Sequence, residues 1–255
     1  LTPSPDRVDP ACPVYDRCGG CSGQHMRYEA TLAAKRTQVY DCLTRIGGLP
    51  LHLEDVPPVL GAEHPWHCRN KTALPVGGTA DAPVLGFYRR RSHQIVPIDD
   101  CPVAMGGLTG VIAAVKEWMR AEHIQPYDEA TGRGLLRHVV TRVSRAGSLM
   151  VVLAATRAKL PGVPRLIELL NAHARGFCSL HVSVNAERNN VILGRESHRL
   201  YGEDAIFETL LGLTFEMPPL SFFQVNPDQT ERLYQTAVDF AALTQAGVKF
   251  AILRL

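Results

Sequence analysis

Three cysteines within a short N-terminal run constrain this chain more than any other feature. Cys12, Cys18 and Cys21 follow the spacing C-x5-C-x2-C in the stretch CPVYDRCGGCSGQH. Thiolates at such close spacing select soft metals, either zinc or an iron–sulfur cluster, and both normally take four protein ligands. The sequence therefore predicts a metal site whose fourth ligand comes from elsewhere in the chain.

The fourth ligand must be one of four more distant cysteines. Cys42 falls inside a predicted helix, where it is most simply a core residue. Cys68 and Cys178 fall in apolar, strand-like stretches, where a buried cysteine acts as a small hydrophobe. Cys101 lies in a loop before Pro102, and a distant Cys-Pro pair is typical of the end of cluster-binding patterns. Cys101 is the predicted fourth ligand, and spacing alone leaves zinc and iron–sulfur equally open.

The composition is that of a globular protein. Hydrophobic residues make up 45% of the 255 positions, charged residues make up 20%, and the net charge is +2. No apolar run approaches the ~18 residues that a membrane span requires, so we expect no membrane partner. An odd count of seven cysteines without a secretion signal argues against a disulfide framework and favours the cytoplasm. The oligomeric state stays open.

Hydrophobic periodicity predicts a mixture of helices and antiparallel strands. The expected helices cover residues 28–46, 107–123, a stretch from Pro164, and 228–243, and Asn226 is the predicted N-cap of the last one. The expected strands form a meander over 66–98, a hairpin over 135–156, single strands at 179–187, 190–194 and 248–253, and a hairpin over 206–217. The first and last helices each carry an apolar stripe. These stripes must either bury each other or remain exposed, and exposure would favour self-association.

Four motifs, in order, resemble landmarks of the bacterial RNA (uracil-C5)-methyltransferases. They read CPVYDRCGGCSGQH, WHCRNKTALPV, GFYRRRSHQIVPIDDCPV and LSFFQVNPDQTERLY. The likeness extends from Cys12 to about Phe240 and is greatest to the 23S ribosomal RNA branch, the RlmD type. In that family the cysteine set binds a 4Fe–4S cluster. The resemblance implies such a cluster on four residues here: Cys12, Cys18, Cys21 and Cys101.

The resemblance also implies a reaction, methylation of C5 of a uridine in 23S rRNA with S-adenosylmethionine. In the family a cysteine thiolate adds to C6, the enolate takes the methyl group, and a general base removes the C5 proton. The nucleophile and base lie far downstream in a Rossmann-like domain, so we expect no catalytic residue in this chain. In the motif SFFQVN, the resemblance assigns Gln224 to the cofactor and Phe222 and Phe223 to the target base. The plainer alternative is that the two phenylalanines are core residues and that Gln224 caps a turn.

Basic residues gather on and between the strands of the predicted meander. The set comprises Arg69, Lys71, Arg89, Arg90, Arg91 and His93. Together with Trp66 and Tyr88 they suit phosphates and stacked, unpaired bases, so we expect them to bind RNA. A solvated hairpin tip is the plainer interpretation. A second run containing Arg133, Arg137 and His138 could extend this surface.

The expected fold class is α/β, in two parts. Residues 1–26 and 57–219 would form an α+β central domain with an antiparallel sheet, the cluster and the RNA surface. Residues 27–56 and 220–255 would begin a Rossmann-like methyltransferase domain that is cut short. We therefore expect a fragment that is inactive alone. The alternatives are a non-catalytic, metal-stabilised RNA-binding module and a tRNA uracil-C5 methyltransferase.

Overall fold

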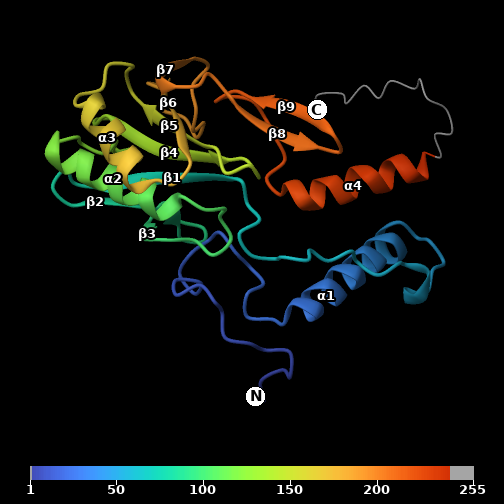
Figure 1. Cartoon of the computed structure of the whole chain (residues 1–255). Coiled ribbons are helices and arrows are strands. Elements are labelled where there is room, and N and C mark those ends of the chain that lie inside the picture. Colours follow the sequence, from blue (N-terminus) through green and yellow to red (C-terminus); the bar gives the residue numbers. More distant parts are fainter. Residues whose placement is uncertain (1, 242–255) are drawn as a thin grey trace.

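A seven-stranded sheet forms the centre of the computed structural model, which describes residues 2–241 (Figure 1). The strand order is β3-β2-β1-β4-β5-β6-β7. The bounds are β1 (Lys71–Gly78), β2 (Pro83–Tyr88), β3 (Ile95–Pro97), β4 (Leu136–Val143), β5 (Leu149–Ala155), β6 (Phe177–Val184) and β7 (Ser197–Gly202). Neighbours pair antiparallel except β5 and β6, which are parallel and are joined through the helix α3 (Val163–His173). The predicted mixed fold with its meander is confirmed.

Two helices cover one face of this sheet. The apolar stripe predicted for residues 107–123 forms the buried side of α2 (Leu108–Ala121), and its Trp118 is fully buried. The Trp118 indole donates a hydrogen bond to the Pro161 carbonyl oxygen at 3.0 Å. A Cβ added to Gly110 would lie 2.0 Å from the His173 carbonyl oxygen, so glycine lets α2 approach the end of α3 closely. The largest core cluster lies between these helices and the sheet.

A smaller apolar cluster lies on the other face of the sheet. It joins Val140, Met150 and Val152 of the central strands to the hairpin of β8 (Ile206–Leu210) and β9 (Leu213–Met217). Phe223 packs against the same cluster. The segment that follows β9 is therefore held close to the central strands.

Two details differ from the expected elements. Residues 190–194 are a loop, because the Asn185 and Asn189 side chains hydrogen-bond the Val191 backbone and so replace a strand partner. The strand that pairs with β6 is instead β7, an edge strand whose exposed polar side chains show no apolar alternation. Cys42 is exposed rather than part of the core, in the π-helical turn Cys42–Ile46 that extends α1 (Tyr28–Asp41).

The helices α1 and α4 (Pro227–Phe240) lie beside the sheet rather than on it (Figure 1). Residues 61 and 62 contact both helices: the Ala62 amide donates to the Tyr28 hydroxyl at 2.6 Å, and the Arg232 guanidinium donates to the Gly61 carbonyl. The Asn226 side chain accepts from the Gln229 amide at 3.1 Å, which confirms the predicted N-cap. The predicted strand at 248–253 lies outside the described residues.

The apolar stripes of α1 and α4 do not bury each other. Ile46 is 84% exposed and Phe240 is 87% exposed, and Val39 and Leu233 are also exposed. Between residues 2 and 241, no helix combines the length and apolar character needed to cross a bilayer.

Candidate functional site

The four predicted cysteine ligands line one cavity of about 200 Å³. Cys12, Cys18 and Cys21 come from the N-terminal loop, and Cys101 comes from the loop after β3. Apolar side chains complete much of the wall, among them Val14, Phe87, Ile98 and Val103. The fold thus brings together thiols that are about eighty residues apart in the sequence.

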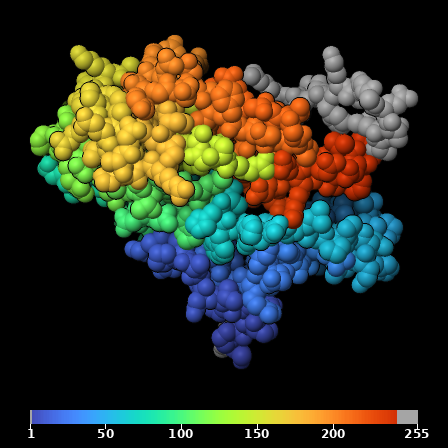
Figure 2. All heavy atoms as spheres, in the orientation of Figure 1, coloured from blue at the N-terminus to red at the C-terminus, as the bar shows by residue number. Residues whose placement is uncertain are grey.

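The N-terminal loop is fixed to the turn between β2 and β3. The Gly19 amide donates to the Tyr88 carbonyl at 2.9 Å, Cys18 forms an antiparallel bridge with Arg89, and the Arg90 guanidinium donates to the Cys21 carbonyl at 2.7 Å. A Cβ on Gly19 would lie 2.7 Å from the Tyr88 oxygen, so this approach requires glycine. The space-filling view shows the N-terminal residues, in blue, on one flank of the molecule (Figure 2).

Electrostatics in the cysteine cavity favour neutral thiols in the absence of a cation. Burial raises the pKa of the Cys18 and Cys101 thiols, and charge on Cys12 and Cys21 raises the pKa of both further. All four thiols are free. Within the described residues, no three His, Cys, Asp or Glu side chains already stand in an arrangement that holds a metal ion. Ligation would therefore require the Cys18 and Cys101 thiols to lose their protons against the effect of burial.

The remaining cysteines show no sign of nucleophile activation. Cys42 is exposed on α1, and burial raises the pKa of the half-buried Cys68 and Cys178 thiols. A catalytic thiol needs a lowered pKa. The raised pKa values of Cys68 and Cys178 are the opposite of what nucleophile activation requires.

The turn after β2 carries a positive surface, which we call the arginine turn and define as residues 89–93. Arg89, Arg90, Arg91 and His93 are exposed. His93 Nδ1 lies 2.6 Å from Glu129 Oε2, and burial together with Glu129 raises the pKa of Tyr88 to about 12. In the described part of the chain, none of the three arginines forms an ion pair with a carboxylate. Their charges are therefore available to an external anion.

The structure does not gather all of the predicted RNA-binding residues on this turn. Arg69 lines the cysteine cavity. Lys71 begins β1 and lies opposite Arg142 of β4, whose guanidinium donates to the Ser221 carbonyl. Of the second basic run, Arg137 and His138 are buried in β4, where Arg137 donates to loop carbonyls and stacks over a tyrosine ring. Lys71 therefore lies near the segment 221–224, through its partner Arg142, and not on the arginine turn.

Asn70 holds the segment that carries Gln224. Its side-chain amide donates to the Gln224 carbonyl at 3.0 Å, and its backbone amide donates to the Val225 carbonyl at 2.8 Å. The Phe222 and Gln224 side chains are exposed, whereas Phe223 packs on the sheet with its ring 5.9 Å from that of Phe215. Asn70 was not among the predicted site residues, although its position between two cations in the run RNK distinguishes it.

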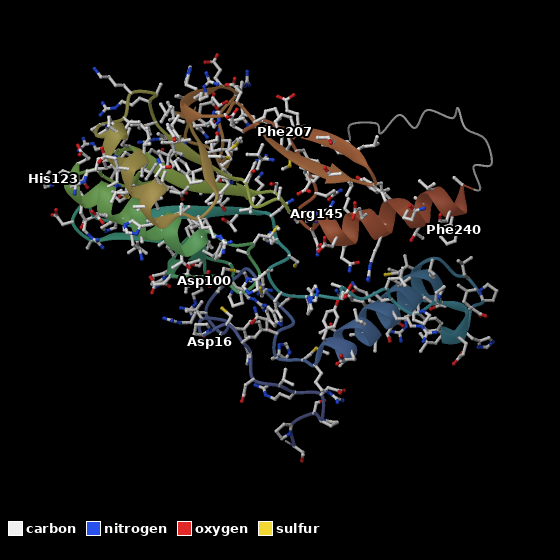
Figure 3. The ribbon with its side chains drawn as sticks, in the orientation of Figure 1. Asp16, Asp100, His123, Arg145, Phe207 and Phe240 are labelled. Carbon is white, nitrogen blue, oxygen red and sulfur yellow. The ribbon has the colours of Figure 1, made fainter. Side chains whose placement is uncertain are left out.

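Arg145 connects the sheet to α4 from the turn between β4 and β5 (Figure 3). Its guanidinium contacts Glu208 Oε1 at 3.1 Å, Glu231 Oε2 at 2.7 Å and Asp228 Oδ1 at 3.4 Å. Hydrogen bonding to Arg145 and to the Leu211 amide lowers the pKa of Glu231 to about 2. The sequence pattern indicates only a turn here, because the three acids lie far away in the chain.

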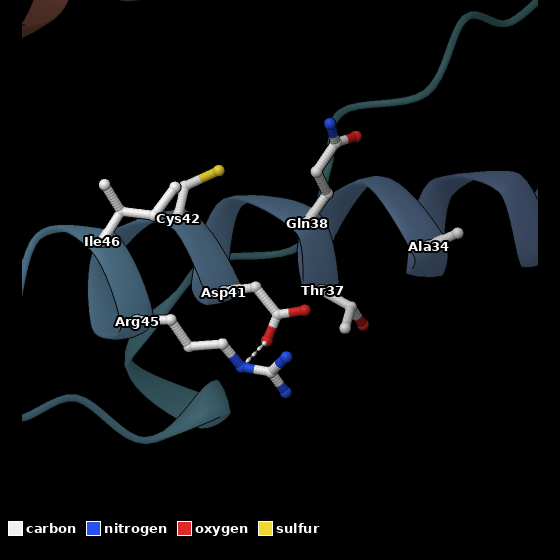
Figure 4. A pocket seen from close by; sticks show the side chains of 7 residues that line it. All are labelled: Ala34, Thr37, Gln38, Asp41, Cys42, Arg45 and Ile46. Atoms are coloured by element: carbon white, nitrogen blue, oxygen red, sulfur yellow. Dashed lines mark ion pairs between the residues drawn. The ribbon is translucent and has the colours of Figure 1, made fainter.

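An open hollow along α1 is a weaker candidate for a site. It is lined by one helix only and displays Cys42, Ile46 and an ion pair of 3.2 Å between Arg45 Nε and Asp41 Oδ1 (Figure 4). A surface formed by a single helix cannot enclose a small ligand.

Comparison with known proteins identifies relatives of the whole described region. The chain is 40% identical over 251 residues to an uncharacterized RNA methyltransferase of Clostridium tetani, covering 98% of this chain and 54% of that protein. It is 43% identical over 242 residues to an uncharacterized RNA methyltransferase of Halalkalibacterium halodurans, and this match covers 94% of this chain and 52% of that protein. The chain is therefore similar, over almost its whole length, to proteins named as RNA methyltransferases. The predicted resemblance to RNA methyltransferases is confirmed.

A solved structure has the same fold. The tRNA (uracil-54, C5)-methyltransferase of Pyrococcus abyssi, in complex with S-adenosyl-L-homocysteine, superposes with a TM-score of 0.70 and 27% identity, covering 92% of this chain and 52% of that one. No family model matches the chain. The chain spans about half the length of the relatives it matches.

Proposed function

We propose that this chain is the RNA-binding, cysteine-ligated part of an S-adenosylmethionine-dependent RNA methyltransferase that modifies C5 of a uridine. One observation carries the proposal: four cysteines from two distant segments line a single cavity, and the loop that supplies three of them is bonded to the arginine turn. Its homologues bear the name of RNA methyltransferases. A metal at the cavity would therefore fix the loop beside a cationic surface suited to RNA.

The cavity fits a 4Fe–4S cluster in its donor set. Four free thiols and an apolar wall match the all-cysteine ligation and shielded setting of such clusters. Cys12, Cys18, Cys21 and Cys101 would hold the cluster, and its contribution would be structural, since it would tie the N-terminal loop to the sheet.

We assign 23S rRNA as the substrate on the strength of the motif resemblance. A transfer RNA is the second candidate, because the structural relative from Pyrococcus abyssi acts on tRNA. Gln224 would contact S-adenosylmethionine and Phe222 the target base, whereas Phe223, which packs on the sheet, would support this segment from behind. The positions of α1 and α4 beside the sheet support the division into a central part, 1–26 and 57–219, and a methyltransferase part, 27–56 and 220–255.

RNA binding tests the function. We expect an unmodified 23S rRNA fragment to bind more tightly than unmodified tRNA at equal salt. Changing Arg89, Arg90 and Arg91 together to Ala should lower the slope of log affinity against log salt by about 2, since each single-strand phosphate contact contributes about 0.7. Arg195→Ala, at an exposed site elsewhere, is the control. Unchanged affinity in the triple variant would rule out the arginine turn, and preference for tRNA would overturn the rRNA assignment.

Metal analysis tests the cluster separately. Anaerobically purified protein should be brown and contain iron and acid-labile sulfide. Cys101→Ala should lose both, whereas Cys178→Ala, which changes a half-buried thiol outside the cavity, should retain them. Colourless protein with one zinc ion per chain would contradict the cluster.

A further inference from the structure

Two cations face each other across the first central strand pair. Lys71 of β1 and Arg142 of β4 are register partners in an antiparallel ladder, so their side chains lie on the same face of the sheet. Arg142 is only 3% exposed and Lys71 is half-buried. Like charges placed directly opposite each other destabilise a sheet, and removal from water adds to that cost.

No carboxylate compensates this pair within residues 2–241. Arg142 donates to the Ser221 carbonyl oxygen, its buried Nε has no hydrogen-bond partner, and no ion pair involves either residue in that range. Burial lowers the pKa of Lys71, and the charge of Arg142 lowers it further; burial also lowers the pKa of Arg142. The described protein therefore leaves two desolvated positive charges without an anion.

The location of the pair points to its anion. Asn70, adjacent to Lys71, fixes the carbonyls of Gln224 and Val225, and Arg142 fixes the carbonyl of Ser221. The pair therefore adjoins both ends of the segment that displays Phe222 and Gln224. An RNA strand that presents a base to this segment carries a backbone phosphate on each side of that nucleotide.

We propose that Lys71 and Arg142 together bind a backbone phosphate of the RNA, next to the nucleotide that contacts Phe222. This site is separate from the arginine turn, and it rests on the proposed function. A phosphate supplies the negative charge that the fold lacks, and the guanidinium and ammonium groups provide donors for its oxygens. The carboxylate of S-adenosylmethionine shares this anionic chemistry, so the test separates the two sources.

The test uses Lys71→Gln, with Lys159→Gln as a control at an exposed position. One lost single-strand phosphate contact should lower the salt slope by about 0.7, which corresponds to about fivefold weaker binding of single-stranded uridine-containing RNA at 0.1 M salt. Lys71→Arg should restore most of the affinity. Replacing single phosphates of the RNA by neutral methylphosphonates should weaken wild-type binding at one position, and that position should become insensitive in Lys71→Gln.

The melting temperature without RNA distinguishes a binding role from a structural one. Because Lys71 is repelled by Arg142 and desolvated, Lys71→Gln should raise the melting temperature while it weakens RNA binding. A lowered melting temperature with unchanged RNA affinity would overturn the proposal. Weaker binding of S-adenosylhomocysteine with unchanged RNA binding would assign the anion to the cofactor and also overturn it. If the wild type bound no RNA, the proposed function would fail as well.

Discussion

The sheet with α2 and α3 differs sharply from the pair α1 and α4 in how it uses apolar residues. Every residue of β4 and β5 is buried, as are the apolar stripe of α2 and Leu166 and Leu170 of α3. In contrast, α1 buries none of its residues and α4 buries only Pro227 and Thr230. Both regions contain large apolar side chains, but only the sheet with α2 and α3 covers most of them within the described chain.

The difference shows that the two regions are held by different forces. The sheet is stabilised by apolar burial, which is worth about 1.5–3 kcal/mol for each large side chain. The position of α4 depends on polar contacts from Arg145, Asn70 and Arg232. A few substitutions should therefore separate α4 from the sheet while the sheet stays folded.

Arg145→Ala should have the largest effect on this comparison. Glu208 is only 3% exposed, and removal of Arg145 leaves its carboxylate buried and unpaired, at an expected cost of about 3–5 kcal/mol. It also removes the ion pairs to α4. Urea unfolding monitored by circular dichroism measures the loss in unfolding free energy. Hydrogen exchange should show lower protection of backbone amides in α4 than in β5. A cost below about 1 kcal/mol would show that α4 is held by other contacts.

A matched pair of leucines tests burial directly. Leu153→Ala removes a fully buried side chain from β5 and should cost about 2–5 kcal/mol. Leu233→Ala removes a side chain that is 63% exposed on α4 and should change the unfolding free energy by less than about 0.5 kcal/mol. Equal losses in the two variants would mean that α4 buries Leu233 against a partner in solution.

The two regions should lose stability in different pH ranges. Burial lowers the pKa of His138 in β4 to about 4 from an ordinary 6.5, so the unfolded chain takes up this proton first and stability falls by about 3 kcal/mol as pH drops from 6.5 to 4. Glu231 has its pKa lowered to about 2 from 4.5, so its contribution is complete above pH 4.5 and is lost towards pH 2. His138→Gln should remove the pH dependence of stability only between pH 6.5 and 4, and Glu231→Gln should remove it only between pH 4.5 and 2. The midpoint of denaturant unfolding at each pH measures both effects.

The smallest effect on stability is expected on the exposed stripes. Ile46→Lys and Phe240→Lys together should leave the melting temperature almost unchanged, since both side chains are largely exposed. They should reduce concentration-dependent self-association, because exposed apolar patches favour it. Sedimentation velocity at rising concentration measures this. A wild type that stays monomeric at high concentration would remove the basis for the prediction.

Local pattern predicted most elements because their burial follows simple periods. The alternation and apolar runs of residues 66–98, 135–156 and 206–217 matched the observed strands, and the capping residue Asn226 marked the start of α4. The sequence could not predict that residues 190–194 form a loop, because side-chain amides of Asn185 and Asn189 replace the strand partner there. It also placed Cys42 in the core, since the stripe beside it was assumed to be covered.

The candidate site was predictable as far as its residues cluster in sequence or follow a motif. The four cavity cysteines and the arginine turn were found in this way. Asn70, Arg142 and Arg145 were not predicted, because each contacts a segment about eighty or more residues away in the chain. Arg142 also lies opposite Lys71, and only the register of the β1–β4 ladder shows this. Hydrophobic periodicity predicts which face of an element is buried, but it does not predict which polar side chains contact each other.

The contacts of residues 61 and 62 also set an order of events during synthesis. The Arg90 side chain that holds the cysteine loop follows Cys21 by 69 residues, whereas Arg232 follows its Gly61 partner by 171. At about 5–20 residues per second, Arg232 leaves the ribosome roughly 10–30 s after Gly61. The helix α1 is therefore bound to residue 62 early, whereas α4 reaches its contact with Gly61 late. Val39 and Ile46 remain exposed in the described structure, so they are surface that a nascent-chain chaperone would encounter from an early stage of synthesis.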